Sequence, residues 1–292
     1  MPPLFVTEEL AMATPKPCWA VCLGVTLLLS GCGNYLVNKV AFQPLPFAPA
    51  DYEITDARIQ EVEFWSDDRV RLHAFYIPYP GEQPLVIFLQ GNFGNALQRI
   101  FDAWELAKTG VNVLLVGYRG YGRSAGTPSE QGLYRDAAAA IDYAIRGLGY
   151  REGDIYLLGR SLGSAVALDA AQHRGIGGLI LISPFPSGDA VLRAQGAGWL
   201  GWLTAGSPFD SQAKVGNARV PALFVQAEGD QLIPERLSRQ LFEAYPSPYK
   251  SIVRVPGAGH NDIFSVAGGK LWQRVGRFVH HPRQPVAAVE LL

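Results

Sequence analysis

Leu157-Leu158-Gly159-Arg160-Ser161-Leu162-Gly163-Ser164-Ala165 is the stretch that decides the fold of this chain. The apolar run Ile155 to Leu158 precedes its Gly-x-Ser-x-Gly pentapeptide, and small and apolar residues continue after it to Ala171. The first pattern is typical of a buried strand and the second of a helix. The sequence therefore predicts a strand, a sharp turn and a helix.

Ser161 is the predicted nucleophile, because a tight strand-to-helix turn projects the serine Oγ to where a base can reach it. Such a turn leaves little room for side chains two positions before and after the serine, and Gly159 and Gly163 meet that demand. The helix that begins there directs its free N–H groups and the positive end of its dipole at a developing oxyanion. With 32 glycines in the chain, the pentapeptide can also arise by chance. Whether Ser161 is a nucleophile is therefore decided by the predicted strand and helix around it and by the presence of partner residues.

The composition indicates one large α/β domain. The chain has 292 residues, 25 Lys plus Arg against 26 Asp plus Glu, and 48% hydrophobic residues. Balanced charge, without a basic stripe interleaved with aromatic residues, argues against a nucleic-acid partner. A single α/β domain of about 200 to 250 residues is common, and the hydrophobic content suffices for its core.

Short apolar runs alternate with helical patterns after Pro84, which predicts a doubly wound, mostly parallel sheet. An antiparallel hairpin, Ile59 to Trp65 and Val70 to Ile77, is predicted before it. The predicted parallel strands are Leu85 to Leu89, Val111 to Val116, Ile155 to Leu158, Leu179 to Ile182, Ala222 to Val225 and Ile252 to Val255. The predicted helices are Ala96 to Lys108, Glu130 to Gly147 with a capping box from Thr127, Leu162 to His173, Glu235 to Tyr245 and Lys270 to Val279.

Residues 1–31 have the pattern of an export signal. Lys16 precedes an apolar run of 12 residues, Cys18 to Leu29, which is short for a membrane span. The run ends in Leu29-Ser30-Gly31-Cys32, which resembles the lipobox of bacterial lipoproteins, whose cysteine is lipidated and becomes the first mature residue. An ordinary signal peptide cut nearby and an uncleaved anchor are the alternatives. The predicted translation start is Met1 or Met12, and a start at Met12 would give a more typical export signal.

The lipobox resemblance implies a protein held by acyl chains at Cys32 in the outer membrane, facing the periplasm, because Gly33 and not aspartate follows the cysteine. All three cysteines lie in or at the end of this segment, so the mature domain is expected to have no disulfide. Residues 32–55 are assigned to the lipidated cysteine and a tether, and residues 281–292 to a C-terminal tail.

His260 is the predicted general base. It lies in a glycine-rich loop, Pro256 to Asp262, directly after the last predicted strand, where ligands of such sheets bind. A lone histidine is more often structural, but the other four stand in less suitable places: His73 in a strand, His173 far along a helix, and His280 and His281 beyond the last helix.

Asp230 is the acid predicted to orient that histidine. It follows the strand that begins at Ala222, and the order Ser161, Asp230, His260 is the order of one family of triads. Glu228 is the competing candidate for this acid. The alternative for Asp230 is a purely structural role as a helix-capping residue. The two oxyanion donors are assigned to the backbone N–H groups of Leu162 and of Asn92, which follows the first parallel strand.

Residues 59–278 resemble an α/β-hydrolase of the cap-poor serine aminopeptidase-like and acyl-protein-thioesterase-like branch. The resemblance implies an α/β-hydrolase domain over residues 56–280 with a minimal cap. The motifs that carry it are Gln90-Gly91-Asn92-Phe93-Gly94-Asn95, Gly117-Tyr118-Arg119-Gly120-Tyr121-Gly122-Arg123-Ser124, Thr127-Pro128-Ser129-Glu130, Gly159-Arg160-Ser161-Leu162-Gly163, Asp230 to Pro234 and Pro256-Gly257-Ala258-Gly259-His260-Asn261.

The chain departs from that family at two positions. Histidine is usual where Gln90 stands and a small residue where Phe93 stands, so we expect the oxyanion loop to be held differently and the acyl side of the pocket to be narrower. The cap position, Phe185 to Pro221, is short, and its apolar residues form either a small flap or ordinary core: Trp199, Leu200, Trp202 and Leu203.

We therefore expect a cofactor-free and metal-free serine hydrolase that cleaves an ester or thioester with an apolar, small-molecule or lipid-like acyl group. A peptidase or amidase of the same fold is the alternative among enzymes. A binding protein that has kept the fold without catalysis is the alternative outside enzymes, with Gln90 and Phe93 in its favour. The sequence carries no signal of an oligomeric state.

Overall fold

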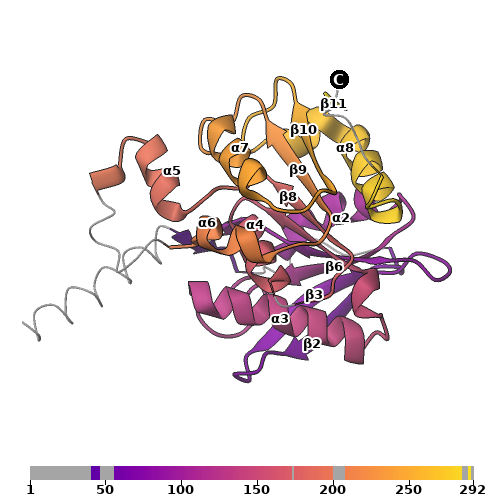
Figure 1. Cartoon of the computed structure of the whole chain (residues 1–292). Coiled ribbons are helices and arrows are strands. Elements are labelled where there is room, and N and C mark those ends of the chain that lie inside the picture. The colour runs from indigo at the N-terminus through magenta and orange to yellow at the C-terminus, as the bar shows by residue number, and fades with distance from the viewer. Residues whose placement is uncertain (1–40, 47–55, 173, 200–207, 285–288, 291–292) are drawn as a thin grey trace, which may run out of the picture.

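The computed structural model describes residues 41–46, 56–172, 174–199, 208–284 and 289–290, whose main sheet lies between two layers of helices (Figure 1). Its nine strands lie in the order β11-β10-β9-β8-β7-β4-β6-β3-β2. They are β2 (Gln60–Trp65), β3 (Arg71–Ile77), β4 (Leu85–Leu89), β6 (Asn112–Gly117), β7 (Ile155–Arg160), β8 (Gly178–Ile182), β9 (Ala222–Ala227), β10 (Lys250–Val255) and β11 (Val289–Glu290).

The hairpin and the parallel sheet confirm the fold class expected from the sequence. β2 pairs with β3 and β3 with β6 in antiparallel fashion, whereas the strands from β6 to β11 run parallel to one another. Every residue of β4, β6, β7, β8 and β9 is buried, which is why these strands appear in the sequence as unbroken apolar runs.

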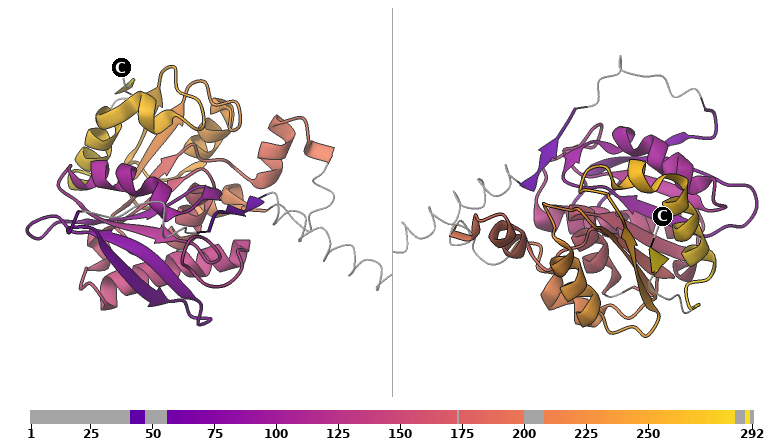
Figure 2. Two further views of the ribbon diagram at one scale, coloured as in Figure 1. Left: turned by 180° about the vertical axis from the view of Figure 1, so that it is seen from behind. Right: turned by 90° about the horizontal axis from the view of Figure 1, so that it is seen from above.

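The two faces of the sheet bury separate cores under different helices (Figures 1 and 2). One core lies under α3 (Glu130–Arg146), α4 (Leu162–Ala171) and α7 (Glu235–Ala244), and the other lies under α2 (Ile100–Ala107) and α8 (Ile263–His280). The remaining described helices are α5 (Gly188–Ala194), α6 (Ser211–Lys214) and the 3₁₀ turns Ala96–Arg99, Glu152–Asp154 and Val215–Asn217. Helices on both faces make the sheet doubly wound.

The cap of one helix and the start of another differ from the predicted ones. The N-cap of α3 is Ser129, whose Oγ accepts a hydrogen bond from the Gly132 N–H, so the predicted capping box from Thr127 was wrong. α8 begins at Ile263 with a helical segment that the sequence did not predict, and this segment meets the predicted helix at a kink at Gly268, which adopts the non-helical angles φ 54° and ψ −142°. Glycine tolerates that conformation, and the interruption hid the first two turns of the helix in the sequence pattern.

Of the N-terminal segments assigned from the sequence, the structure describes only part of the tether. The signal segment 1–31 and Cys32 lie outside the described residues, whereas residues 41–46 of the expected tether pack on the domain. β1 (Gln43–Pro44) pairs in parallel with β5 (Phe93–Gly94). At the other end, β11 adds two residues of the expected tail to the sheet beside β10. Across the described ranges no helix is both long and apolar enough to cross a membrane.

Candidate active site

Ser161 occupies a sharp turn between β7 and α4. Its backbone has φ 53° and ψ −119°, a conformation that costs a non-glycine residue of order 1–3 kcal/mol. A Cβ on Gly159 would lie 2.2 Å from the Gly163 carbonyl oxygen, and one on Gly163 would lie 2.1 Å from the Leu89 carbonyl oxygen. Both glycines of the pentapeptide are therefore required by space, as the sequence pattern predicts.

The turn brings Ser161 together with His260 and Asp230. The Ser161 Oγ lies 3.1 Å from His260 Nε2, and His260 Nδ1 lies 2.8 Å from Asp230 Oδ2. An ionised carboxylate can only accept, so Nδ1–H donates to Asp230 and the lone pair of Nε2 faces the Ser161 hydroxyl. Ser161 and Asp230 are buried, and 8% of the His260 side chain is exposed. This arrangement can transfer the hydroxyl proton to the imidazole.

The two candidate acids in the loop after β9 have different contacts. The Leu232 and Ile233 N–H groups donate to Asp230 Oδ1 at 3.0 and 2.7 Å, which leaves Oδ2 for His260. Glu228 is half exposed and pairs instead with Arg254 at 3.6 Å. Of the two candidate acids it is therefore Asp230 that contacts His260. The helix-capping alternative for Asp230 was wrong, because the N-cap of α7 is Pro234 and no side chain caps that helix.

The two predicted oxyanion donors lie on segments that meet beside Ser161. Leu162 is the first residue of α4, where a backbone N–H has no partner within its own helix. The loop after β4 passes close by, because a Cβ on Gly91 would lie 3.7 Å from the Ser161 Cβ. Asn92 follows Gly91 directly, so its N–H is within the same turn of chain.

The loop that carries Asn92 is held through its main chain. Gln90 is 1% exposed, and neither polar atom of its side chain has a hydrogen-bond partner in the described part of the protein. The Tyr118 hydroxyl donates to the Gln90 carbonyl oxygen at 3.1 Å, and the Tyr121 hydroxyl donates to the Asn92 carbonyl oxygen at 2.7 Å. Both tyrosines come from the Gly117 to Ser124 motif. The side chain at position 90 thus contributes no hydrogen bond to the loop.

Arg160 is a site residue that sequence reasoning missed. Its Nη2 donates to the His260 carbonyl oxygen at 2.6 Å, and its guanidinium lies over the Phe264 ring. Burial lowers the pKa of Arg160 to about 10. A charged residue at the end of an otherwise apolar strand, directly before the serine, is the signal that could have singled it out. Its contact with the His260 main chain ties the histidine loop to the serine turn.

The cap is described only in part. α5 follows β8, and Gln195 Nε2 donates to the carbonyl oxygens of Gln231 and Leu232 at 2.7 and 3.1 Å, next to the loop that holds Asp230. Trp199 is 69% exposed, so at this position the described residues do not form ordinary core. Leu200, Trp202 and Leu203, the other residues of the expected flap, lie outside the described residues.

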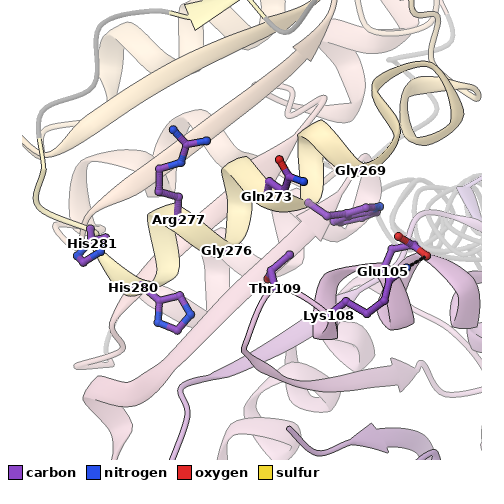
Figure 3. Close-up of a pocket in the computed structure, with 10 residues that line it drawn as sticks. Glu105, Lys108, Thr109, Gly269, Gln273, Gly276, Arg277, His280 and His281 are labelled. Atoms are coloured by element: carbon purple, nitrogen blue, oxygen red, sulfur yellow. Dashed lines mark hydrogen bonds and ion pairs between the residues drawn. The ribbon is translucent and has the colours of Figure 1, made fainter.

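A separate cavity of about 520 Å³ lies between α2 and α8 (Figure 3). Its lining comes from the carboxyl-terminal halves of the two helices, including Lys108, Arg277 and His280. Helices of a doubly wound fold run antiparallel to their strands, so this cavity opens at the opposite edge of the sheet from Ser161. It takes no part in the site. In the described ranges, no group of three His, Cys, Asp or Glu side chains is placed to hold a metal ion.

Comparison with known proteins identifies relatives of this chain. The family described as serine aminopeptidase, S33, matches residues 84–208. The Mycobacterium tuberculosis protein Rv2307c, which carries no functional name, is 34% identical over 226 residues, covering 75% of this chain and 79% of that protein.

Among solved structures, the esterase Pf2001 of Pyrococcus furiosus superposes with a TM-score of 0.68 at 20% identity, over 84% of this chain and 99% of its own. An α/β-hydrolase of Vibrio vulnificus gives a TM-score of 0.66 at 22% identity, over 93% and 97%. The Arabidopsis thaliana α/β-hydrolase domain-containing protein WAV2 is 30% identical over 281 residues, 87% of this chain and 89% of WAV2. The fold, the serine turn and these relatives together show that the chain belongs to the α/β-hydrolase family.

Proposed function

We propose that this protein is a serine hydrolase that cleaves a carboxylic ester or thioester through an acyl-enzyme. The observation that carries the proposal is the continuous chain of contacts from the Ser161 hydroxyl through His260 to the buried carboxylate of Asp230. A strained serine, an imidazole with its Nε2 lone pair toward the hydroxyl, and an acceptor fixed by two backbone N–H groups are what nucleophilic catalysis requires.

In the first half of the reaction, His260 Nε2 takes the Ser161 proton as Oγ attacks the carbonyl carbon of the substrate. Asp230 stabilises the imidazolium that forms. The tetrahedral oxyanion accepts hydrogen bonds from the Leu162 and Asn92 N–H groups, and it collapses when His260 gives its proton to the leaving alcohol or thiol. Water then attacks the acyl-enzyme with His260 again as base, which releases the acid and regenerates Ser161.

An apolar acyl group is the favoured substrate feature, because large apolar side chains are exposed on segments that follow the catalytic edge of the sheet. Phe93 of the oxyanion loop is 52% exposed, Trp199 of the cap 69% and Leu232 of the Asp230 loop 41%. The esterase Pf2001 shares the fold. Peptide or amide hydrolysis is the second candidate, and the match of residues 84–208 to the serine aminopeptidase family favours it.

The proposal is tested with a fluorophosphonate probe and with matched p-nitrophenyl esters and p-nitroanilides of increasing acyl length. We expect stoichiometric labelling at Ser161 and turnover of esters well above anilides, with a preference for apolar acyl chains. Anilide turnover comparable to ester turnover would make the peptidase reading correct. A folded protein that neither labels nor turns over either series would identify a binding protein that has kept the fold.

We also propose that Cys32 is lipidated and holds the protein at the outer membrane, with the hydrolase domain in the periplasm. The lipobox-like Leu29 to Cys32 segment supports this. Expressed in a bacterium with lipoprotein-processing enzymes, the wild-type protein is expected to fractionate with the outer membrane and its precursor to accumulate in globomycin. Cys32→Ala is expected to abolish both behaviours. A Cys32→Ala protein that still partitions with membranes would contradict lipidation.

A further inference from the structure

Residues 41–46, which we call the strap, lie directly against the oxyanion loop. The Gln43 N–H donates to the Asn92 carbonyl oxygen at 2.9 Å, and the Leu45 N–H donates to the Gly94 carbonyl oxygen at 3.0 Å. The strap thus adds a short parallel strand, β1, to the loop that carries a proposed oxyanion donor. It reaches this loop from about 50 residues away in the sequence, before the first strand of the sheet.

The strap is fixed to the rest of the domain on its other sides. Phe42 is 5% exposed and packs edge-to-face on Phe209, with ring centroids 6.0 Å apart. The Leu45 carbonyl oxygen accepts from the Gly122 N–H at 3.2 Å, and Asn95 Nδ2 donates to the Pro46 carbonyl oxygen at 3.4 Å. A strand of two residues has little stability alone, so these contacts are what make the strap a firm support.

The strap and Tyr121 act on the same acceptor. The Asn92 carbonyl oxygen receives the Gln43 N–H at 2.9 Å and the Tyr121 hydroxyl at 2.7 Å, which uses both of its lone pairs. These two donors fix the plane of the Asn92–Phe93 peptide. Because the Asn92 N–H belongs to the preceding peptide, fixing the following one limits the rotation that would turn this N–H away from Ser161. The side chain of Gln90, in contrast, forms no hydrogen bond with the described residues.

We infer that the strap is a positioning element of the oxyanion hole, and that the backbone N–H of Gln43 is its key group. The inference rests on the proposed serine hydrolase function. Its consequence is that the segment expected to serve only as a tether is needed for the rate of the chemical step. Weakening the strap should lower the stabilisation of the tetrahedral oxyanion more than it lowers substrate binding, because the oxyanion contact develops only in the transition state.

The test compares Gln43→Pro, which removes the N–H, with Gln43→Ala, which keeps it. The Gln43 side chain is exposed, and the next residue, Pro44, shows that the strap tolerates proline. Both variants are made in the whole mature protein and assayed with the best p-nitrophenyl ester. We expect kcat of Gln43→Pro to lie about 10-fold below that of Gln43→Ala with KM within about twofold, less than the 10²–10³ lost when a donor is removed outright.

A boronic acid inhibitor, which becomes tetrahedral when the Ser161 Oγ adds to its boron, gives a readout that a merely structural role would not move. Its affinity is expected to fall in parallel with kcat in Gln43→Pro, while the affinity of the product acid stays unchanged. Tyr121→Phe, which removes the other donor to Asn92, is expected to shift kcat and inhibitor affinity in the same direction.

If Gln43→Pro does not fold, Phe42→Ala loosens the strap without removing an N–H and is expected to lower kcat, with Phe42→Leu restoring most of it. Wild-type turnover together with unchanged kcat and boronic acid affinity in folded Gln43→Pro would overturn this inference and leave the proposed function intact. In the case of unfolded Gln43→Pro, unchanged kcat in Phe42→Ala would do the same. A wild-type protein without turnover would overturn both.

Discussion

Ser161→Ala is expected to lower kcat for ester hydrolysis by about 10⁶-fold, the loss found when a triad serine is removed from an enzyme of this mechanism. Without Oγ no acyl-enzyme forms, and water must attack the bound ester with help only from the oxyanion donors. The measurement is steady-state turnover of the preferred p-nitrophenyl ester, with active-site titration to exclude contamination. Ser265→Ala, at an exposed serine near the start of α8, is the matched control and should retain turnover.

Ser161→Gly separates the catalytic loss from the strain of the turn. It should be as inactive as Ser161→Ala, since both lack Oγ. Glycine adopts φ 53° and ψ −119° without steric cost. The free energy of unfolding of Ser161→Gly should therefore exceed that of Ser161→Ala by about 1–3 kcal/mol. Urea unfolding of the two variants measures the difference. Ester turnover retained in either variant would show that Ser161 is not the nucleophile.

Asp230→Asn is expected to lower kcat by about 10⁴-fold, as the equivalent change does in a serine protease. The asparagine oxygen can still accept the Leu232 and Ile233 N–H groups, which places its NH₂ group toward His260 Nδ1. The imidazole must then carry its proton on Nε2, facing Ser161, and cannot take the hydroxyl proton. The fold should persist because the asparagine side chain has nearly the same shape as the aspartate it replaces.

Glu228→Gln is the matched control for that variant, because it removes a carboxylate two residues away. Glu228 is half exposed and pairs with Arg254, which also pairs with Glu235 at 2.8 Å. We therefore expect turnover of Glu228→Gln within about twofold of wild type, measured side by side with Asp230→Asn. A large loss in Glu228→Gln with normal turnover in Asp230→Asn would reassign the acid.

Local sequence patterns were enough to predict the scaffold. The central strands are buried on both faces, so each one appears as an apolar run, and the space around Gly159 and Gly163 admits no side chain. His260 was also predicted from a local pattern, because it lies in a glycine-rich loop directly after the last long strand. Where a helix is kinked at a glycine, as α8 is at Gly268, the pattern predicted only the segment after the kink.

The amino-acid sequence by itself therefore determined the order of strands and helices, the serine turn and the short set of polar residues at the catalytic edge, because each depends on neighbours in the chain. Only the tertiary structure decided which acid meets His260, that Arg160 reaches the His260 carbonyl, and that the strap supports the Asn92 loop. These choices depend on the directions of side chains and on backbone pairings between segments from 30 to 100 residues apart, which no local pattern encodes.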